Sequence, residues 1–397
     1  MQEAGIIQSI LDTDLYKFTM QQAVCKLYPN QVVKYEFYNR GQTKFPLDFA
    51  ERLQCEVSKM ANLALTKSEQ EFLRSKSFFD QVYVDFLAGY RFDPDEISIS
   101  QINDNLSITI QGYWYRTILW EVPLMALISE LYFLDQSESI FSREVREKNN
   151  IAKGAIFCSN ELKLADFGTR RRYSYANQFE VCQDLQHMSN SPQFFVGSSN
   201  PHIAMKLGLN VLGTHAHEWF MFMGAYYGVK MANYMALEQW VEVYGGNLGI
   251  ALTDTYTSDV FFKMFNMKFA KLFDGVRHDS GCPFTFVDKT VAHYLKLGIA
   301  PQSKTIIFSD GLDSNISLDI AEYCKKIGIA CSFGIGTNLT NDIGVQPLNI
   351  VIKMTGALVD NEFIETIKLS DDVSKHTGKT EQIEIIQKSL GIFKQTL

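Results

Sequence analysis

Two histidines, His215 and His217, lie close together in the segment Gly-Thr-His-Ala-His-Glu-Trp at residues 213–219. An amphipathic helical pattern follows over residues 216–240, and Thr214 is a suitable N-cap for it. His217 is therefore expected in the first helical turn, where free backbone N–H groups and the helix dipole favour negative charge. A histidine in this position can carry or contact a phosphoryl group. The alternative is that both histidines are ordinary polar residues of a turn.

Three consecutive arginines, Arg170, Arg171 and Arg172, follow a short apolar run. The guanidinium group presents several N–H donors in a planar fork that matches phosphate oxygens. Arginine runs more often form a solvated face of a protein. Their position directly after an expected strand favours a site for a large phosphate group such as pyrophosphate.

A second phosphate-binding candidate is Gly-Ile-Gly-Thr, which includes Gly334, Gly336 and Thr337. It lacks the lysine of a P-loop, and the chain has no helix-opening G-x-G-x-x-G segment. As an isolated motif it is weak. At the end of a strand, however, successive glycine N–H groups and a threonine hydroxyl can surround one phosphate monoester.

The remaining candidates are carboxylates, one arginine and one aromatic ring. Asp279, Asp310 and Asp313 offer hard oxygen ligands that could hold Mg²⁺ on a pyrophosphate. No firm metal site is predicted, and Asp279 and Asp310 are the candidate ligands. Arg277 suits a substrate carboxylate, and Tyr16 suits a flat ring, although a core position is equally compatible with Tyr16. The histidine pair lacks a third ligand at the usual spacing, which argues against zinc.

These residues share a position, because most of them follow a short apolar run in the second half of the chain. Short apolar runs that alternate with helical stretches are typical of βα units. The carboxyl ends of parallel strands share one face, where active sites are built. Caps and turns explain the Gly, Ser, Thr and Asp residues, but not the arginines and histidines. The expected strands are residues 162–167, 194–196, 210–212, 249–252, 272–276, 305–308 and 329–333.

The fold class expected is therefore α/β, with an irregular βα barrel-like domain of mostly parallel strands over residues 151–345. Residues 1–150 are predicted to form a mixed α+β N-terminal domain that ends in a long helical connection from residue 117. Residues 346–397 are expected to pack back on that domain. The strands expected outside the barrel are residues 32–38, 83–87, 96–102, 106–114 and 363–369, and residues 347–355 form a further strongly apolar run.

Composition limits the possible functions. The chain has 397 residues, of which 46% are hydrophobic, and its net charge of −8 argues against broad binding to nucleic acid or anionic membranes. Its seven cysteines form no C-x-x-C pair, which favours reduced thiols without a disulfide framework. The most apolar window, residues 118–134, contains Glu121 and Glu130 and is too polar for a membrane span. Asp12 and Asp14 interrupt any signal sequence, so a cytoplasmic protein is expected.

Six segments together resemble the nicotinate phosphoribosyltransferase family, in the family's order and over residues 12 to 355. Each segment is weak alone, whereas the six linked together are highly specific. They are Asp-Thr-Asp-Leu-Tyr-Lys from Asp12, Gly-Thr-Arg-Arg-Arg-Tyr-Ser from Gly168, Gly-Thr-His-Ala-His-Glu-Trp from Gly213, Ala-Leu-Thr-Asp-Thr from Ala251, Val-Arg-His-Asp-Ser-Gly from Val276 and Phe-Gly-Ile-Gly-Thr-Asn-Leu-Thr from Phe333.

The resemblance implies an irregular barrel of the type II phosphoribosyltransferase kind and an ATP-coupled reaction. Nicotinate and 5-phosphoribosyl 1-pyrophosphate would give nicotinate mononucleotide and pyrophosphate, with Mg²⁺ as the cation. The family's phosphorylated histidine matches His217, whereas His215 occupies a variable position. The bacterial members imply a homodimer, whose partner subunit can complete the site.

The predicted site combines residue chemistry with this resemblance. The resemblance assigns nicotinate contacts to Tyr16, Thr214 and Arg277, and a phosphoribosyl contact to Thr337. The catalytic residues expected are His217, Asp279 and Arg277, and the substrate-binding residues expected are Tyr16, Thr214, Arg277, Arg170, Arg171, Gly334, Gly336, Thr337 and Asp310.

Two other functions remain open at this point. A relative that uses nicotinamide would share many of these residues, although Arg277 favours a carboxylate over a neutral amide. A non-catalytic sensor of phosphate ligands could keep the same fold. Intact arginines, aspartates and His217 argue against a sensor, because a decayed site is expected to lose some of them.

Overall fold

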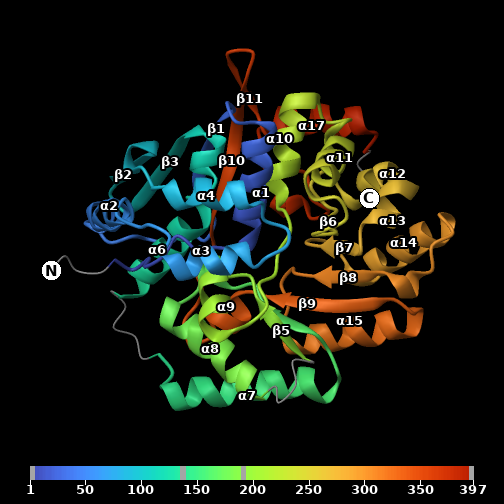
Figure 1. The fold of residues 1–397 in the computed structure, drawn as a ribbon, viewed down its shortest axis with the longest axis horizontal. Coiled ribbons are helices and arrows are strands. Elements are labelled where there is room, and N and C mark those ends of the chain that lie inside the picture. The colour runs from blue at the N-terminus through green and yellow to red at the C-terminus, as the bar shows by residue number, and fades with distance from the viewer. Residues whose placement is uncertain (1–4, 135–139, 189–193, 393–397) are drawn as a thin grey trace.

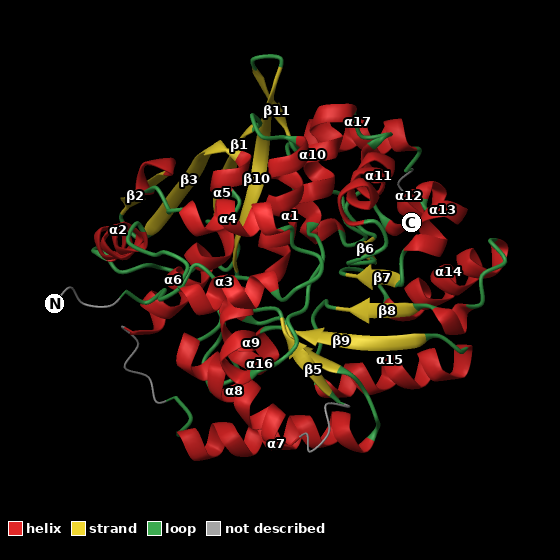
Figure 2. Ribbon diagram, in the orientation of Figure 1, coloured by secondary structure: helices red, strands yellow, loops and turns green. Residues whose placement is uncertain are grey.

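Two β-sheets organise the chain, one antiparallel and one parallel (Figure 1). The computed structural model describes residues 5–134, 140–188 and 194–392. Figure 2 shows that helices surround the parallel sheet and pack beside the antiparallel one. The α/β fold class expected from the sequence is confirmed.

The antiparallel sheet belongs mainly to the first third of the chain. Val33 and Tyr35 of its central strand are buried, and the flanking positions are partly exposed, as alternation along a strand requires. A tight turn with Asn103 at a positive φ of 55° joins two of its strands. The strands are β1 (Val32–Asn39), β2 (Ile97–Ile102), β3 (Asn105–Tyr113), β10 (Ile350–Val359) and β11 (Glu362–Glu365), in the order β11-β10-β1-β3-β2.

Strand β10 enters this sheet from the far end of the chain. It pairs antiparallel with β1, from Val33 opposite Ala357 to Asn39 opposite Ile350. Ile350, Ile352 and Met354 are buried, and helices α6 (Glu121–Leu134) and α10 (His217–Tyr227) pack against β10. The apolar run after the barrel thus completes the N-terminal sheet.

The parallel sheet carries the βα units of the second half. Its strands are short, and after each of them the chain continues through a loop into a helix. They are β4 (Leu164–Asp166), β5 (Phe195–Ser198), β6 (Ile250–Leu252), β7 (Gly275–His278), β8 (Thr305–Phe308) and β9 (Ala330–Ile335), in the order β5-β4-β9-β8-β7-β6.

Residues 211–214 lie between the two edge strands of this sheet. Val211 forms a parallel bridge with Ser198 of β5, and the Thr214 hydroxyl donates to the carbonyl of Ile250 in β6 at 3.0 Å. The segment at residues 210–212, expected as one of seven strands, therefore forms a single β-bridge. It closes the curved sheet into the irregular barrel without a continuous ladder of backbone hydrogen bonds.

Helices cover the outer face of the barrel and the inner face of the antiparallel sheet (Figure 2). In the first part of the chain they are α1 (Leu15–Leu27), α2 (Phe49–Met60), α3 (Lys67–Arg74), α4 (Gln81–Gly89), α5 (Trp114–Thr117) and α6 (Glu121–Leu134). In the second part they are α7 (Arg143–Ser159), α8 (Tyr175–Met188), α9 (Pro201–Leu207), α10 (His217–Tyr227), α11 (Ala232–Tyr244), α12 (Ser258–Met264), α13 (Met267–Leu272), α14 (Pro283–Lys296), α15 (Ser314–Ile327), α16 (Thr337–Thr340) and α17 (Thr380–Leu390).

Helix α6 is apolar on all sides and lies in the core. In the described residues, one helical stretch, Trp114–Leu134, has the length and composition of a membrane span. The expectation that Glu121 and Glu130 make it too polar is therefore wrong, but 78% of its apolar window is buried inside the protein. Burial of that kind is typical of the central helix of a globular domain. The helical pattern expected to continue to residue 150 crosses residues 135–139, which lie outside the described residues.

Two further expectations about secondary structure are wrong. Residues 83–87 belong to α4 rather than to a strand, because Tyr83, Val84 and Leu87 are buried together on one face of a helix. The helix expected over 216–240 is two helices, α10 and α11, which Gly228 separates at a positive φ of 83°.

Candidate active site

A cavity of about 510 Å³ opens at the carboxyl ends of the parallel strands. It brings together residues that are far apart in the sequence, as expected if all the βα loops meet at one face. The predicted site residues that line it are Tyr16, Arg170, Arg171, His217, Arg277, Asp279, Asp313, Gly334, Gly336 and Thr337. Among the described lining residues, Thr214 and Asp310 are absent.

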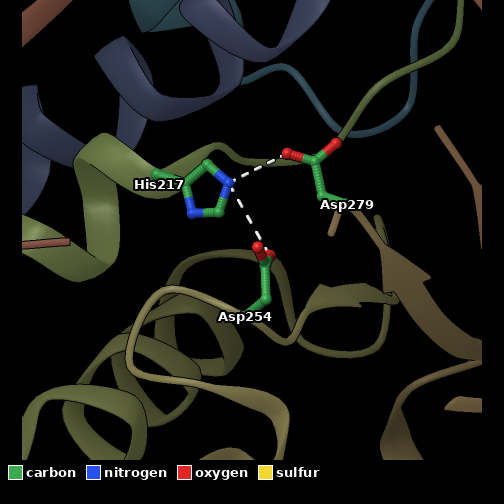
Figure 3. Close-up of side chains that lie close together, drawn as sticks. All are labelled: His217, Asp254 and Asp279. Atoms are coloured by element: carbon green, nitrogen blue, oxygen red, sulfur yellow. Dashed lines mark hydrogen bonds and ion pairs between the residues drawn. The ribbon is translucent and has the colours of Figure 1, made fainter. Parts of the chain in front are cut away.

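His217 is the first residue of α10 and points across the strand ends (Figure 3). Its Nδ1 lies 2.9 Å from the Thr255 hydroxyl, and its Nε2 lies 2.9 Å from Asp279 Oδ2. A carboxylate can only accept a hydrogen bond, so Nε2 carries the proton and Nδ1 accepts from Thr255. Burial, aided by the nearby charge of Lys368, lowers the pKa of His217 below its ordinary value although Asp254 and Asp279 oppose this. The imidazole is therefore neutral and nucleophilic at neutral pH.

Asp279 and Asp254 form a pair of carboxylates beside this imidazole (Figure 3). Burial would raise the pKa of Asp279, but Arg277 and then His217 outweigh it and hold that pKa well below its ordinary value. Asp254 Oδ1 lies 3.7 Å from His217 Nε2, and Lys368 Nζ lies 4.0 Å from the other Asp254 oxygen. Burial opposes ionisation of Asp254, yet His217 and Lys368 lower its pKa. Both carboxylates are thus ionised.

The two carboxylates can hold a cation, whereas both ring nitrogens of His217 are engaged in hydrogen bonds. The ligand atoms of His217, Asp254 and Asp279 lie within 4.8 Å of one another. Within the described part of the chain, the buried Asp254 Oδ1 has no hydrogen-bond partner, which leaves it available to a ligand. Two ionised carboxylates are the hard oxygen donors that Mg²⁺ prefers. The residues present therefore fit Mg²⁺.

Sequence reasoning did not select Asp254 or Lys368. Asp254 lies in Thr-Asp-Thr directly after β6, so the rule that placed the other loops at the strand ends could have found it. Lys368 comes from the segment after β11, which has no βα pattern. Asp310, which was selected, forms an ion pair with Lys375 instead of lining the cavity.

The three arginines have different environments. Arg170 points into the cavity with 49% of its side chain exposed. Arg171 also lines the cavity, and burial together with the charges of Arg170 and Arg40 lowers its pKa to about 10. Arg172 is fully buried and faces away from the cavity, toward Asp12. Two arginines are therefore available to an anion, and the third is structural.

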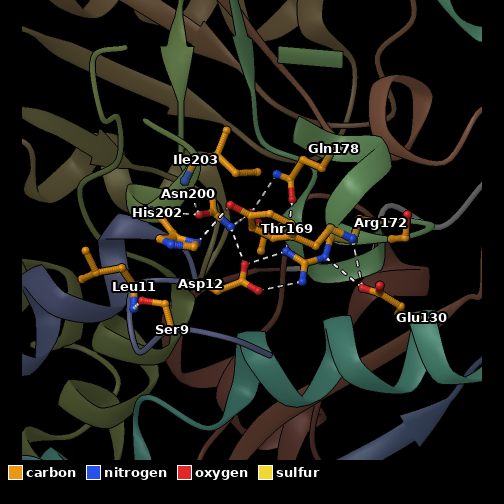
Figure 4. A network of polar contacts seen from close by, with 12 residues as sticks. Ser9, Leu11, Asp12, Glu130, Thr169, Arg172, Gln178, Asn200, His202 and Ile203 are labelled. Carbon is orange, nitrogen blue, oxygen red and sulfur yellow. Dashed lines mark hydrogen bonds and ion pairs between the residues drawn. The ribbon is translucent and has the colours of Figure 1, made fainter. Parts of the chain in front are cut away.

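Arg172 anchors the loop that carries the other two (Figure 4). Its Nη1 and Nη2 donate to the two oxygens of Asp12 at 2.6 and 2.7 Å, and Asn200 donates to Asp12 at 2.8 Å. Glu130 approaches the guanidinium at 3.7 Å. This network joins the segment before α1 to the loops after β4 and β5, and so it places Tyr16 next to Arg170.

Thr214 does not cap the helix that follows it. Its hydroxyl donates to Ile250, and Ala216 occupies the N-cap position of α10. The expected N-cap is therefore wrong, because closure of the barrel takes the hydroxyl. His217 nevertheless lies in the first turn, as expected. Gly213 has a positive φ of 146°, and a Cβ there would lie 3.3 Å from the Tyr16 nitrogen, so a glycine lets these two segments meet.

Thr214 lines a second cavity, of about 290 Å³, inside the barrel. Arg277, Phe167 and Gly334 line both cavities, so the second one continues from the first. Among the described residues, the buried Nε of Arg277 has no hydrogen-bond partner. A Cβ on Gly334 would lie 2.2 Å from the Phe167 ring, so glycine at this position lets the ring lie against β9. Phe167 was not selected from the sequence.

His215 has a structural role. It is fully buried, its Nε2 accepts from the backbone N–H of Leu252 at 3.2 Å, and its ring packs against Trp240 at 4.6 Å. Burial, aided by the charge of Arg277, lowers the pKa of His215 well below its ordinary value. Only His217 of the pair faces the cavity.

The chain is similar to known proteins of one family. Residues 162–393 match the nicotinate phosphoribosyltransferase (NAPRTase) family, and residues 11–129 match the N-terminal domain of that family. The chain is 51% identical to nicotinate phosphoribosyltransferase of Desulforapulum autotrophicum, over 95% of this chain and 97% of that one. The crystal structure of the Porphyromonas gingivalis enzyme superposes with a TM-score of 0.94 at 44% identity, covering 98% of this chain and 100% of that one. The crystal structure of nicotinate phosphoribosyltransferase from Vibrio cholerae superposes with a TM-score of 0.90 at 33% sequence identity. The match covers 98% of this chain and 94% of that one.

Proposed function

Because the chain belongs to the nicotinate phosphoribosyltransferase family, we propose that it joins nicotinate to 5-phosphoribosyl 1-pyrophosphate. The products would be nicotinate mononucleotide and pyrophosphate, which places the enzyme in NAD salvage from nicotinate. The observation that carries the proposal is that Arg170, His217, Arg277 and Thr337 line one cavity.

The cavity offers a distinct partner for each part of the two substrates. At the inner end, Arg277 would bind the nicotinate carboxylate, and the rings of Tyr16 and Phe167 would contact the pyridine ring. Thr337, at the start of α16, and Gly336 would bind the 5-phosphate. Arg170 and Arg171 would bind the pyrophosphate.

The reaction breaks the bond between the anomeric carbon and pyrophosphate, and the ring nitrogen of nicotinate forms the new bond. Positive charge develops on the ribose as the pyrophosphate leaves with the bonding electrons. The main demands are restraint of both substrates in line and stabilisation of the leaving anion. The arginines of the cavity supply the second, and no proton has to be transferred at the reacting carbon.

We propose that ATP acts by phosphorylating His217. The unprotonated imidazole nitrogen attacks the γ-phosphorus, ADP leaves, and water later hydrolyses the phosphohistidine to phosphate. Asp279, which accepts from Nε2 at 2.9 Å, stabilises the charge that the ring acquires during the attack. The phosphoryl group would then lie on the Nδ1 side of the ring, next to Thr255 and across the ring from Asp279. It would change how the arginines hold the phosphoribosyl donor and raise the affinity for that donor, as a population shift requires.

Mg²⁺ would be held by Asp279 and Asp254, with Asp310 as the further carboxylate suggested by the sequence. Bound there, it would neutralise negative charge on the phosphate oxygens of either substrate. We further propose a cytoplasmic homodimer in which the partner subunit completes the site. The division into residues 1–150, 151–345 and 346–397 likewise remains a proposal.

The test follows labelled ATP onto the protein. Acid-labile radioactivity on His217 in the native chain, and its loss in His217→Ala, is the expected result. His217→Ala should also lose the ATP stimulation of turnover. Stimulated turnover in His217→Ala with an unchanged apparent KM for the phosphoribosyl donor would overturn the phosphohistidine step.

The nicotinamide-using alternative is separated by parallel assays. Arg277 predicts turnover of nicotinate in preference to nicotinamide, because a carboxylate can accept a charge-assisted hydrogen bond from the Nε of Arg277, which has no partner among the described residues, and a neutral amide forms a weaker one. A sensor without catalysis would bind nicotinate mononucleotide and release no pyrophosphate. Pyrophosphate release that depends on nicotinate therefore decides between enzyme and sensor.

A further inference from the structure

Lys17 and Glu218 each follow a residue that lines the cavity, yet both point into the protein interior. Lys17 follows Tyr16 on α1, and Glu218 follows His217 on α10. The Lys17 side chain is 0% exposed, and its Nζ lies 2.5 Å from Glu218 Oε2 and 2.5 Å from Glu121 Oε2. A buried ion pair between Lys17 and Glu218, which are 201 positions apart in the sequence, thus joins the segment of Tyr16 to the segment of His217.

The environment of Glu218 requires a carboxylate. Its Oε1 accepts from Trp114 Nε1 at 2.6 Å and from the Tyr35 hydroxyl, while Oε2 accepts from Lys17. Three donors therefore meet two acceptor oxygens. An amide in this position would turn an NH₂ group toward a donor. Helix α10 is consequently fixed at its second residue, directly after His217.

Glu121 extends the ion pair to the cavity wall. While one of its oxygens contacts Lys17, Oε1 lies 4.0 Å from Arg170 Nη1. The charges alternate in the order Arg170, Glu121, Lys17, Glu218 and sum to zero. Buried charges are stable when each has an opposite neighbour, so a change at one end alters the balance at the next.

We propose that Lys17, Glu121 and Glu218 are positioning residues that couple pyrophosphate binding at Arg170 to the state of His217. This inference rests on the proposed function. A phosphoryl group on His217 adds negative charge at the head of α10, which attracts the positive charge of Lys17 toward that helix. Lys17 then shifts toward Glu218, its hold on Glu121 changes, and Arg170 is repositioned for the pyrophosphate. The reverse path lets pyrophosphate departure promote loss of the phosphoryl group, since coupling between two binding events is reciprocal.

The test compares Glu121→Gln with a matched control. Glu96→Gln is the control, because Glu96 also accepts from an arginine, Arg116, and from the indole of Trp120 at 2.8 Å but belongs to no part of the site. The quantity measured is the apparent KM for the phosphoribosyl donor without ATP, divided by its value with ATP. We expect Glu121→Gln to reduce this ratio by about fivefold or more while Glu96→Gln keeps the native ratio.

Further measurements separate coupling from simple damage. Glu121 is chosen over Glu218 because its side chain is 11% exposed, and a thermal melt checks that the variant folds. Glu121→Asp restores the carboxylate and should recover part of the ratio. A native ratio in Glu121→Gln overturns the inference and leaves the proposed function standing. A ratio of one in the native protein overturns the ATP coupling, and with it this inference.

Discussion

The imidazole of His217 and the carboxylate of Asp279 form a hydrogen bond of 2.9 Å across the ends of the parallel strands. Asp279 comes from the loop after β7 and His217 from the start of α10, so the bond forms only when the barrel is folded. Asp279 also lies 3.9 Å from Arg277, which keeps it ionised. This pair fixes the tautomer of His217 and directs Nδ1 toward Thr255.

Replacement of Asp279 is expected to reduce phosphorylation of His217. Asn keeps the size of the side chain but removes the charge that stabilises a developing imidazolium. We expect Asp279→Asn to lower the rate of phosphohistidine formation by about 100-fold. Rapid-quench measurement of acid-labile phosphate checks this, with His187→Gln at an exposed surface position as the control. A native rate in Asp279→Asn would exclude this role.

Buried His215 should make stability depend on pH. The unfolded chain takes up a proton near pH 6.5, whereas the folded chain resists protonation because burial lowers the pKa of His215. The unfolded state binds more protons in this range, so stability is present above that pH and falls as the pH drops below it. The contribution is at most about 1.4 kcal/mol per pH unit.

Urea denaturation between pH 7.5 and pH 5 measures this slope. His215→Gln should give a shallower slope than the native protein, whatever its absolute stability. Other buried histidines with lowered pKa values, among them His278, keep the slope above zero. An unchanged slope in His215→Gln would show that His215 is already protonated or not buried.

Replacement of Arg172 should affect the stability of the fold, whereas replacement of Arg171 should affect substrate binding. Arg172→Met leaves Asp12 as a buried carboxylate without its partner and is expected to destabilise the fold by about 3–5 kcal/mol. Arg171→Gln removes a cavity residue and should raise the KM for the phosphoribosyl donor with little loss of stability. Chemical denaturation and steady-state kinetics of both variants test the difference. Equal destabilisation by the two would contradict the assignment.

Arg277 should determine the preference for a carboxylate. Lysine retains the charge but loses the planar fork, and its shorter reach places it away from the inner cavity. We expect Arg277→Lys to raise the KM for nicotinate by about 10- to 100-fold, consistent with loss of one charge-assisted hydrogen bond. The KM for the phosphoribosyl donor is the internal control. A parallel rise in both constants would place Arg277 outside the base site.

The position of the loops was predictable because connectivity decides it. Gly336, Thr337, Arg277 and His217 each follow a short apolar run, and parallel strands bring such loops to one face. Their grouping in one cavity required no knowledge of side-chain packing. The alternation of apolar and polar residues was likewise sufficient to predict β1 and the hairpin of β2 and β3, because these strands have one buried face.

Features that depend on distant partners were not predictable. From the sequence, Thr214 is a suitable helix cap, but in the structure its hydroxyl donates to the carbonyl of Ile250. Asp310 is likewise a suitable ligand for a cation, but it forms an ion pair with Lys375. Residues 83–87 form a short apolar run that suits a strand or a helix, and only packing selects the helix. Lys368 reaches Asp254 from the C-terminal part of the chain, a contact that no local pattern announces.

The pairing of β10 with β1 has a consequence for synthesis. Strand β1 is synthesised early, whereas its partner β10 emerges from the ribosome only near the end of translation. Paired residues such as Val33 and Ala357 are separated by most of the chain. Contacts of such long range form slowly, so the barrel can be complete while β1 still has an open edge. A chain cut short before Ile350 would keep every residue of the cavity and leave that edge exposed, and it would aggregate rather than act as a smaller enzyme.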